Sequence, residues 1–96
     1  MGYKLVDHEP YIITGKDGIK EYKIPAQIDL NYEAMEIVLR FNKSEDVIEK
    51  TKICKEFFLH YAPDLEEEGI SDMEYYYMFE DYNKGKIVRK KKMGES

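Results

Sequence analysis

The sequence predicts a small, helix-dominated α+β domain, with an N-terminal β-hairpin followed by about three short helices. Two strand-like segments flank a turn cluster, Gly15–Gly18, and Pro25 ends the second of them because proline lacks an amide donor. Beyond that proline, apolar residues recur at helical spacing in three stretches. Ninety-six residues, 43% of them hydrophobic, fit a single domain with one modest core, expected over residues 1–83.

The segment YIITGKDGIKEYKI predicts the hairpin. Tyr11–Thr14 is rich in β-branched and aromatic residues, and residues 19–24 form the returning strand. Asp17 and Gly18 suit the turn, because glycine readily adopts the positive φ angles that short hairpin loops require. Residues 3–6 are expected to add a further short strand.

The first two helices follow directly. The segment DLNYEAMEIVLRFN predicts a helix with Asp29 or Asn31 as its N-cap. Its apolar side is formed by Leu30, Ala34, Ile37, Val38 and Phe41. The second helix, about residues 45–61, is expected to start from an N-cap at Ser44 and to stop before Pro63. Its apolar stripe comprises Val47, Thr51, Cys54, Phe58 and Tyr61.

The third helix follows an acidic linker, residues 64–69, and is predicted to run from Ser71 to about Asn83. Ser71 and Glu74 have the spacing of a capping box. Residues at i, i+3, i+4 and i+7 are expected to face the core, and these are Tyr75, Met78, Phe79 and Tyr82. Residues 84–96 are expected to form a basic, flexible tail.

No residue pattern predicts catalysis. Cys54 and His60 lie on one predicted helix but point about 120° apart, and Cys54 is expected to behave as a buried apolar side chain. The acidic linker begins like an EF-hand loop, but its twelfth position is Tyr75 instead of a bidentate Glu. We therefore expect a solvated acidic loop, with weak divalent binding left open, and no catalytic residue, metal site or cofactor.

Charge and hydropathy limit the partners and the compartment. The formal net charge of -5 argues against nucleic acid and against anionic membranes, which both require a basic face. No stretch approaches the roughly 18 apolar residues of a membrane span, and no signal peptide is expected. The single cysteine is compatible with a reducing compartment, so a cytoplasmic location is predicted.

The segment EYYYMFEDYN contains the strongest signal for a partner. Tyr76 and Tyr77 fall off the face predicted to be buried, and each has an acid four residues later. Exposed rings supply contact area, while carboxylates discourage self-association and select a basic or amphipathic partner. The alternative is that both rings are half-buried and cover a thin core. The predicted partner-binding residues are Tyr76, Tyr77, Glu80, Asp81, Glu66, Glu67 and Glu68.

Three segments carry a family resemblance. They are the strand ending in a proline, GIKEYKIPAQIDL; the helix NYEAMEIVLRF; and the capped final helix in PDLEEEGISDMEYYYMFEDY. Over about residues 11–83 this layout resembles the small tail assembly chaperones of long-tailed bacteriophages and related prophages. The resemblance implies a non-enzymatic protein that binds the long helical tape measure protein, keeps it soluble and helps to recruit tail tube subunits. It also implies a location in the bacterial host cytoplasm and absence from the finished virion.

In that family a longer protein product often arises by a ribosomal frameshift near the end of the gene, and codons for Lys90–Lys92 can be slippery.

The second functional hypothesis is a small acidic inhibitor or regulator that occupies a basic protein surface, and its binding would weaken steeply with salt. Homo-oligomers are left open, because hairpin edges and aromatic faces can both self-associate.

Overall fold

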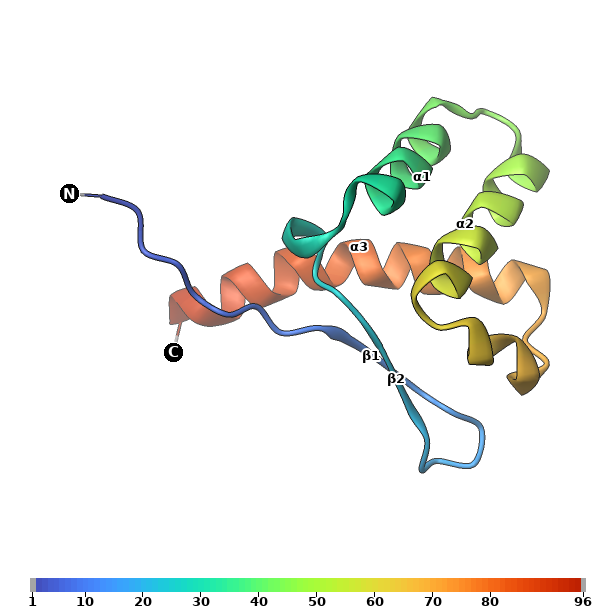
Figure 1. The fold of residues 1–96 in the computed structure, drawn as a ribbon, viewed down its shortest axis with the longest axis horizontal. Helices are drawn as coiled ribbons and strands as arrows, with labels where there is room; N and C mark the ends of the chain where they lie inside the picture. Colours follow the sequence, from blue (N-terminus) through green and yellow to red (C-terminus); the bar gives the residue numbers. More distant parts are fainter. Residues whose placement is uncertain (1, 96) are drawn as a thin grey trace.

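The computed structural model describes the backbone of residues 2–95 and the side chains of residues 2–84. Its elements are β1 (Tyr11–Thr14), β2 (Glu21–Ile24), the 3₁₀ helix η1 (Gln27–Asp29), α1 (Tyr32–Lys43), α2 (Val47–Tyr61), the 3₁₀ helix η2 (Pro63–Glu68) and α3 (Asp72–Glu95). The predicted α+β architecture, with a hairpin before the helices, is confirmed. In Figure 1, α1 and α2 form a helical pair, α3 packs across α2, and the β-hairpin extends beside them.

The β-hairpin is antiparallel, with Tyr11 opposite Ile24. Gly18 adopts a φ of 75°, the positive angle expected of the turn glycine. The additional strand predicted over residues 3–6 was wrong, since the sheet within the described residues has two strands. Pro10 has no amide hydrogen to continue the ladder beyond β1, and the chain before it leaves the body of the protein.

The first two helices begin at side-chain caps. Asn31 caps α1 as predicted, because its Oδ1 accepts a hydrogen bond of 2.9 Å from the amide of Ala34. The N-cap predicted at Ser44 was wrong, since α2 is capped by Asp46, whose carboxylate accepts from the amide of Ile48 at 3.1 Å. A carboxylate interacts more favourably with the helix dipole than a hydroxyl, and Ser44 instead ends α1.

The third helix is longer than the sequence indicated. It begins at Asp72, directly after Ser71, but it continues to Glu95 instead of ending near Asn83. Glycine inside a helix costs about 1 kcal/mol relative to alanine and does not by itself end the helix, so Gly85 was a weak terminator. The side chains of the predicted basic tail lie outside the described residues, except that of Lys84.

Aromatic side chains of α2 and α3 form the centre of the core. Phe57 is fully buried, and its ring centroid lies 5.3 Å from those of Phe58 and Phe79 and 5.4 Å from that of Tyr82. The apolar faces predicted for α1 and α3 are buried or half-buried in this core. On α2 the stripe was less accurate: Phe57 was missed, and Val47 is exposed because it occupies the first turn, beyond the core.

Replacing Phe57 with alanine is expected to destabilise the protein by about 3–5 kcal/mol, because the change leaves a cavity in contact with three other rings. Urea unfolding followed by circular dichroism measures the change. Lys52→Ala, an exposed position of the same helix, serves as the control and is expected to change stability by less than about 0.5 kcal/mol. Equal effects of the two variants would contradict this core.

Candidate interaction surface

Glu68, the last residue of η2, holds the turn of the β-hairpin. Its carboxylate accepts a 2.9 Å hydrogen bond from the amide of Lys16 and a 2.7 Å hydrogen bond from the hydroxyl of Tyr22. These bonds, that from Lys16 foremost, lower the pKa of Glu68, and the same carboxylate raises the pKa of Tyr22 to about 12. Gly15 allows this approach, since a Cβ there would lie 2.7 Å from Glu68 Oε2. Glu68 therefore joins two parts of the fold.

The acidic segment that was expected to be a solvated loop is thus partly structural. It folds as the 3₁₀ helix η2, and Leu65 of this helix is fully buried. Glu66 and Glu67 remain exposed on its outer side. The segment differs from an EF-hand loop, because Glu68, at the fifth loop position, uses its carboxylate to accept hydrogen bonds from the hairpin.

Asp81 and Tyr82 attach α3 to the same hairpin. The Asp81 carboxylate accepts a 2.7 Å hydrogen bond from the hydroxyl of Tyr11, and the hydroxyl of Tyr82 donates to the carbonyl of Pro25 at 2.6 Å. Burial, followed by the bond to Asp81, raises the pKa of Tyr11. Of the predicted partner-binding residues, Glu68 and Asp81 therefore bind their own chain.

The predicted pair of rings has two different environments. Tyr77 is 59% exposed, as expected for a partner-binding side chain. Tyr76 is half-buried, with its ring centroid 6.1 Å from that of Phe41 and 5.9 Å from that of Tyr77. Glu80 is exposed in the next turn of α3. Tyr77 is thus an exposed ring available to a partner, and Tyr76 is a half-buried ring that covers the core.

These rings belong to a larger surface to which all three α-helices contribute. Thr51, one turn after Val47 on α2, has its hydroxyl 3.7 Å from the sulfur of Met73 in the first turn of α3, so the N-terminal parts of the two helices meet there. Both Val47 and Met73 are exposed. We call this region the aromatic surface, and it comprises Phe41, Val47, Met73, Tyr76 and Tyr77.

Sequence reasoning missed three members of the aromatic surface. Phe41 and Val47 were assigned wholly to apolar core stripes, and Met73 was not singled out. A residue in the first or last turn of a helix can match the periodicity of the core and still extend past it. Position at the helix end was therefore the signal that could have identified Phe41 and Val47.

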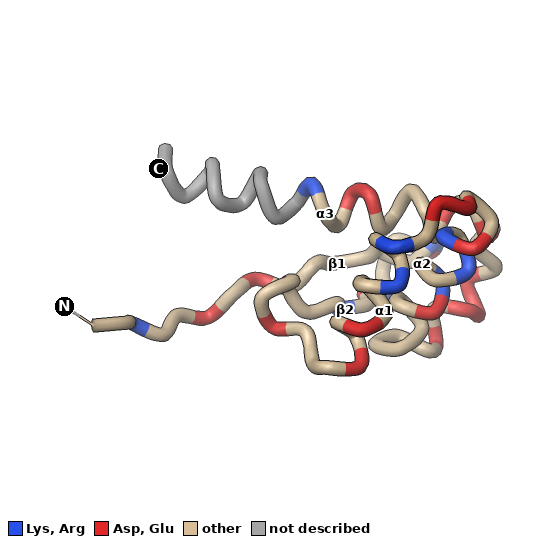
Figure 2. The backbone as a smooth tube through the Cα atoms, turned by 90° about the horizontal axis from the view of Figure 1, so that it is seen from above, with Lys and Arg blue, Asp and Glu red and all other residues tan. Residues whose placement is uncertain are grey.

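Charges of both signs surround the aromatic surface. The ammonium group of Lys50 lies 5.1 Å from the ring centroid of Phe41, and Lys55 pairs with Asp72 at 3.6 Å. Figure 2 shows acidic and basic positions interleaved over the helical end of the protein. Such a mixture suits a partner that is itself amphipathic better than one that is uniformly basic.

Cys54 and His60, the pair considered for catalysis, lie in different surroundings. Cys54 is fully buried, and burial raises the pKa of its thiol to about 12, which leaves little reactive thiolate. His60 lies in the last turn of α2, where its Nε2 is 3.9 Å from a carboxylate oxygen of Glu33 and 3.4 Å from the amide nitrogen of Asn31. Over residues 2–84, no three His, Cys, Asp or Glu side chains form a group able to hold a metal.

No helix in the described part of the chain has the length and apolar character needed to cross a membrane. No protein-family model, curated protein or solved structure matches this chain. The resemblance to tail assembly chaperones therefore depends on the three sequence segments alone.

Glu68→Gln is expected to make stability less dependent on acidic pH. Because the folded-state pKa of Glu68 is lowered from 4.5, its contribution is present above that value and is lost as the pH falls through the lower, folded pKa. The variant should therefore be less stable than the wild type at neutral pH, and the difference should shrink in acid. Urea midpoints measured across that pH range test this.

Glu67→Gln is the matched control, since this neighbouring carboxylate is exposed. It should leave the urea midpoint and its pH dependence nearly unchanged. A difference between Glu68→Gln and wild type that stays constant down to low pH would contradict the role assigned to the Glu68 carboxylate.

Proposed function

We propose that this protein is a non-enzymatic assembly chaperone or adaptor of the phage tail type, which binds a long helical tape measure protein through the aromatic surface. The observation that carries the proposal is the exposed ring of Tyr77, which lies beside the half-buried Tyr76 and Phe41. An aromatic group that is partly buried and partly wet is a typical anchor of protein interfaces.

The composition of this surface suits a helical partner. Amphipathic helices dock by placing apolar side chains at i, i+3, i+4 and i+7 against an apolar surface. Met73 adds an unbranched, adaptable side chain that can fit partner residues of different shapes. One such surface could therefore contact successive apolar turns along a long helix without requiring one fixed sequence.

The charge distribution supports a reversible contact. Residues 1–84 contain 19 of the 20 acidic residues but only 10 of the 15 basic residues, so the described body is strongly acidic. Mutual repulsion limits the non-specific aggregation of acidic copies while they cover apolar partner surface. A chaperone must release its client when the tube subunits assemble, and a small surface of this kind favours a weak, exchangeable contact. The same acidic body would meet tail tube subunits.

The alternative proposal, an acidic inhibitor of a basic protein, requires a continuous acidic face. Glu68 and Asp81 are directed to the hairpin, and Lys50 lies beside Phe41 of the aromatic surface. These observations favour the chaperone or adaptor over the inhibitor, and the two proposals differ in their response to salt.

Tyr77→Ser is expected to reduce the amount of soluble tape measure protein recovered after co-expression, because it removes the most exposed ring of the aromatic surface. The loss in affinity should be about tenfold. The client is the tape measure protein of the phage or prophage that encodes this chain. Ile19→Ser, an equally mild change at an exposed apolar residue of the hairpin turn, is the control and should leave the yield unchanged. No gain in client solubility with the wild-type protein would contradict the chaperone role.

Charge reversal of the exposed acids separates the two proposals. Glu66→Lys combined with Glu67→Lys should slow association with the client but leave the complex intact at high salt, because the contact is mainly apolar. Pull-down at low and high ionic strength measures this. An inhibitor would instead lose binding with the reversed charges and would dissociate from its basic partner as salt is raised.

A further inference from the structure

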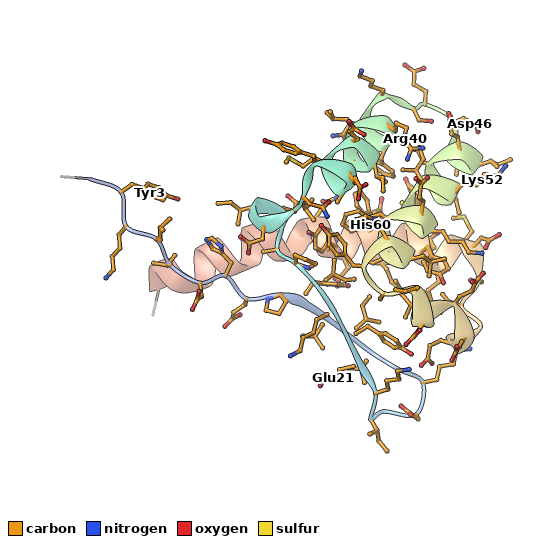
Figure 3. All side chains as sticks on the ribbon, in the orientation of Figure 1. Tyr3, Glu21, Arg40, Asp46, Lys52 and His60 are labelled. Atoms are coloured by element: carbon orange, nitrogen blue, oxygen red, sulfur yellow. The ribbon has the colours of Figure 1, made fainter. Side chains whose placement is uncertain are left out.

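Residues 2–10 form an arm that carries apolar side chains away from the body of the protein. Figure 1 shows this arm extending from the start of β1, and Figure 3 shows Tyr3 standing apart from the other side chains. Tyr3 is 83% and Leu5 is 85% exposed, and Val6 is also exposed. At the base of the arm, Nδ1 of His8 lies 3.2 Å from a carboxylate oxygen of Asp29 in η1. The arm therefore leaves the body beside the beginning of α1.

A second exposed apolar feature lies on α1, which has apolar residues on two sides. The inner side, with Ala34 and Ile37, is buried in the core. On the outer side, apolar residues at i, i+3 and i+7 continue from one apolar residue of η1, and all of them are exposed. We call this the outer stripe, and it comprises Ile28, Tyr32, Met35 and Leu39.

The outer stripe is separate from the aromatic surface. Leu39 and Phe41 are two residues apart on α1, so their side chains leave the helix in nearly opposite directions, about 160° apart. A partner seated on the aromatic surface would therefore leave the outer stripe uncovered. The two surfaces require two different occupants.

The apolar residues of the arm and of the outer stripe have a similar spacing. In an extended chain Tyr3 and Leu5 point to the same side and lie about 7 Å apart, at about 3.3 Å per residue. Along α1, at about 1.5 Å per residue, neighbouring members of the outer stripe from Tyr32 to Leu39 lie about 5–6 Å apart. Tyr3 and Leu5 could therefore lie along two neighbouring residues of the outer stripe.

The charges of the arm and of α1 are complementary in one direction only. Along the arm, Lys4 comes before Asp7. Along α1, Glu33 and Glu36 lie near the start and Lys43 lies in the last turn. When the arm runs parallel to α1, Lys4 lies at the end of the arm nearer the two acids, and Asp7 lies nearer the basic end of the helix. The antiparallel direction brings like charges together, which is unfavourable.

The arm can run parallel to α1 of a second copy, but not to α1 of its own chain. On its own α1 the arm would have to fold back from its base at His8, so Asp7 would lie near Glu33 and Lys4 near the end of α1. That is the antiparallel arrangement with like charges adjacent. A second copy can present its α1 in the parallel direction, and that direction brings opposite charges together.

From these observations we propose that the arm of one molecule docks in parallel on the outer stripe of another copy of this chain. Tyr3 and Leu5 leave water on docking, and apolar residues of the outer stripe are covered. The arm and the outer stripe are different surfaces, so each molecule can donate its arm and accept another at the same time. The contact is independent of the tape measure partner and does not depend on the function proposed above.

The test is disulfide trapping between two separately purified full-length variants, Leu5→Cys and Met35→Cys. The native Cys54 is fully buried with a raised pKa, so it should not take part. After mixing and mild oxidation, non-reducing electrophoresis should show several-fold more mixed dimer than the control mixture of Ile19→Cys with Met35→Cys. Ile19 is as exposed as Leu5 but lies in the hairpin turn.

A charge exchange makes the test specific. Lys4→Glu on the Leu5→Cys chain should lower the trapped yield several-fold, and Glu36→Lys on the Met35→Cys chain should restore it. Trapping no greater than in the control mixture would overturn the proposal. So would a chain carrying both new cysteines that closes within one molecule, at the mass of the monomer, in preference to joining two.

Discussion

A hairpin of two four-residue strands cannot be stable alone in water, so its attachment to the helices is the constraint on which this fold depends. Three tyrosine hydroxyls make that attachment. Tyr22 donates to η2, Tyr11 donates to α3, and Tyr82 of α3 donates back to the carbonyl of Pro25. Each ring packs in or against the aromatic core while its hydroxyl reaches a polar partner at the edge.

This attachment decides which acidic residues remain available to a partner. Glu68 and Asp81 accept the hydroxyls of Tyr22 and Tyr11, so removing either acid would disturb the hairpin as well as the surface charge. Glu80, in contrast, points to solvent beside the aromatic surface. The fold thus divides the acids predicted to bind a partner into residues that hold the structure and residues that can meet another molecule. The proposed adaptor function relies only on the second group.

The sequence was sufficient for the elements whose signals are local. The hairpin turn at Gly18, the cap at Asn31 and the buried face that includes Tyr75 and Phe79 all follow from residue type and spacing, and all are present. The start of α2 was misplaced because two capping residues, Ser44 and Asp46, compete within three positions. Periodicity alone could not decide between them.

The candidate surface was less predictable because it depends on contacts between distant segments. The bond from Tyr22 to Glu68 joins residues 46 positions apart, and that from Tyr11 to Asp81 joins residues 70 apart, so neither structural role is visible in local spacing. The same is true of Phe41 beside Tyr76. The exposure of Tyr77 could be predicted, since helical phase alone places it away from the core.

In the proposed function, the partner binds on the helices, while the hairpin and its attached acids serve the fold. Hydrogen exchange of the full chain, with and without the tape measure protein, distinguishes these roles. Protection should increase at the end of α1 and in the first turns of α2 and α3, around Phe41, Val47 and Tyr77, with exchange in β2 unchanged. Protection centred on the hairpin turn and η2, with none around Tyr77, would contradict it.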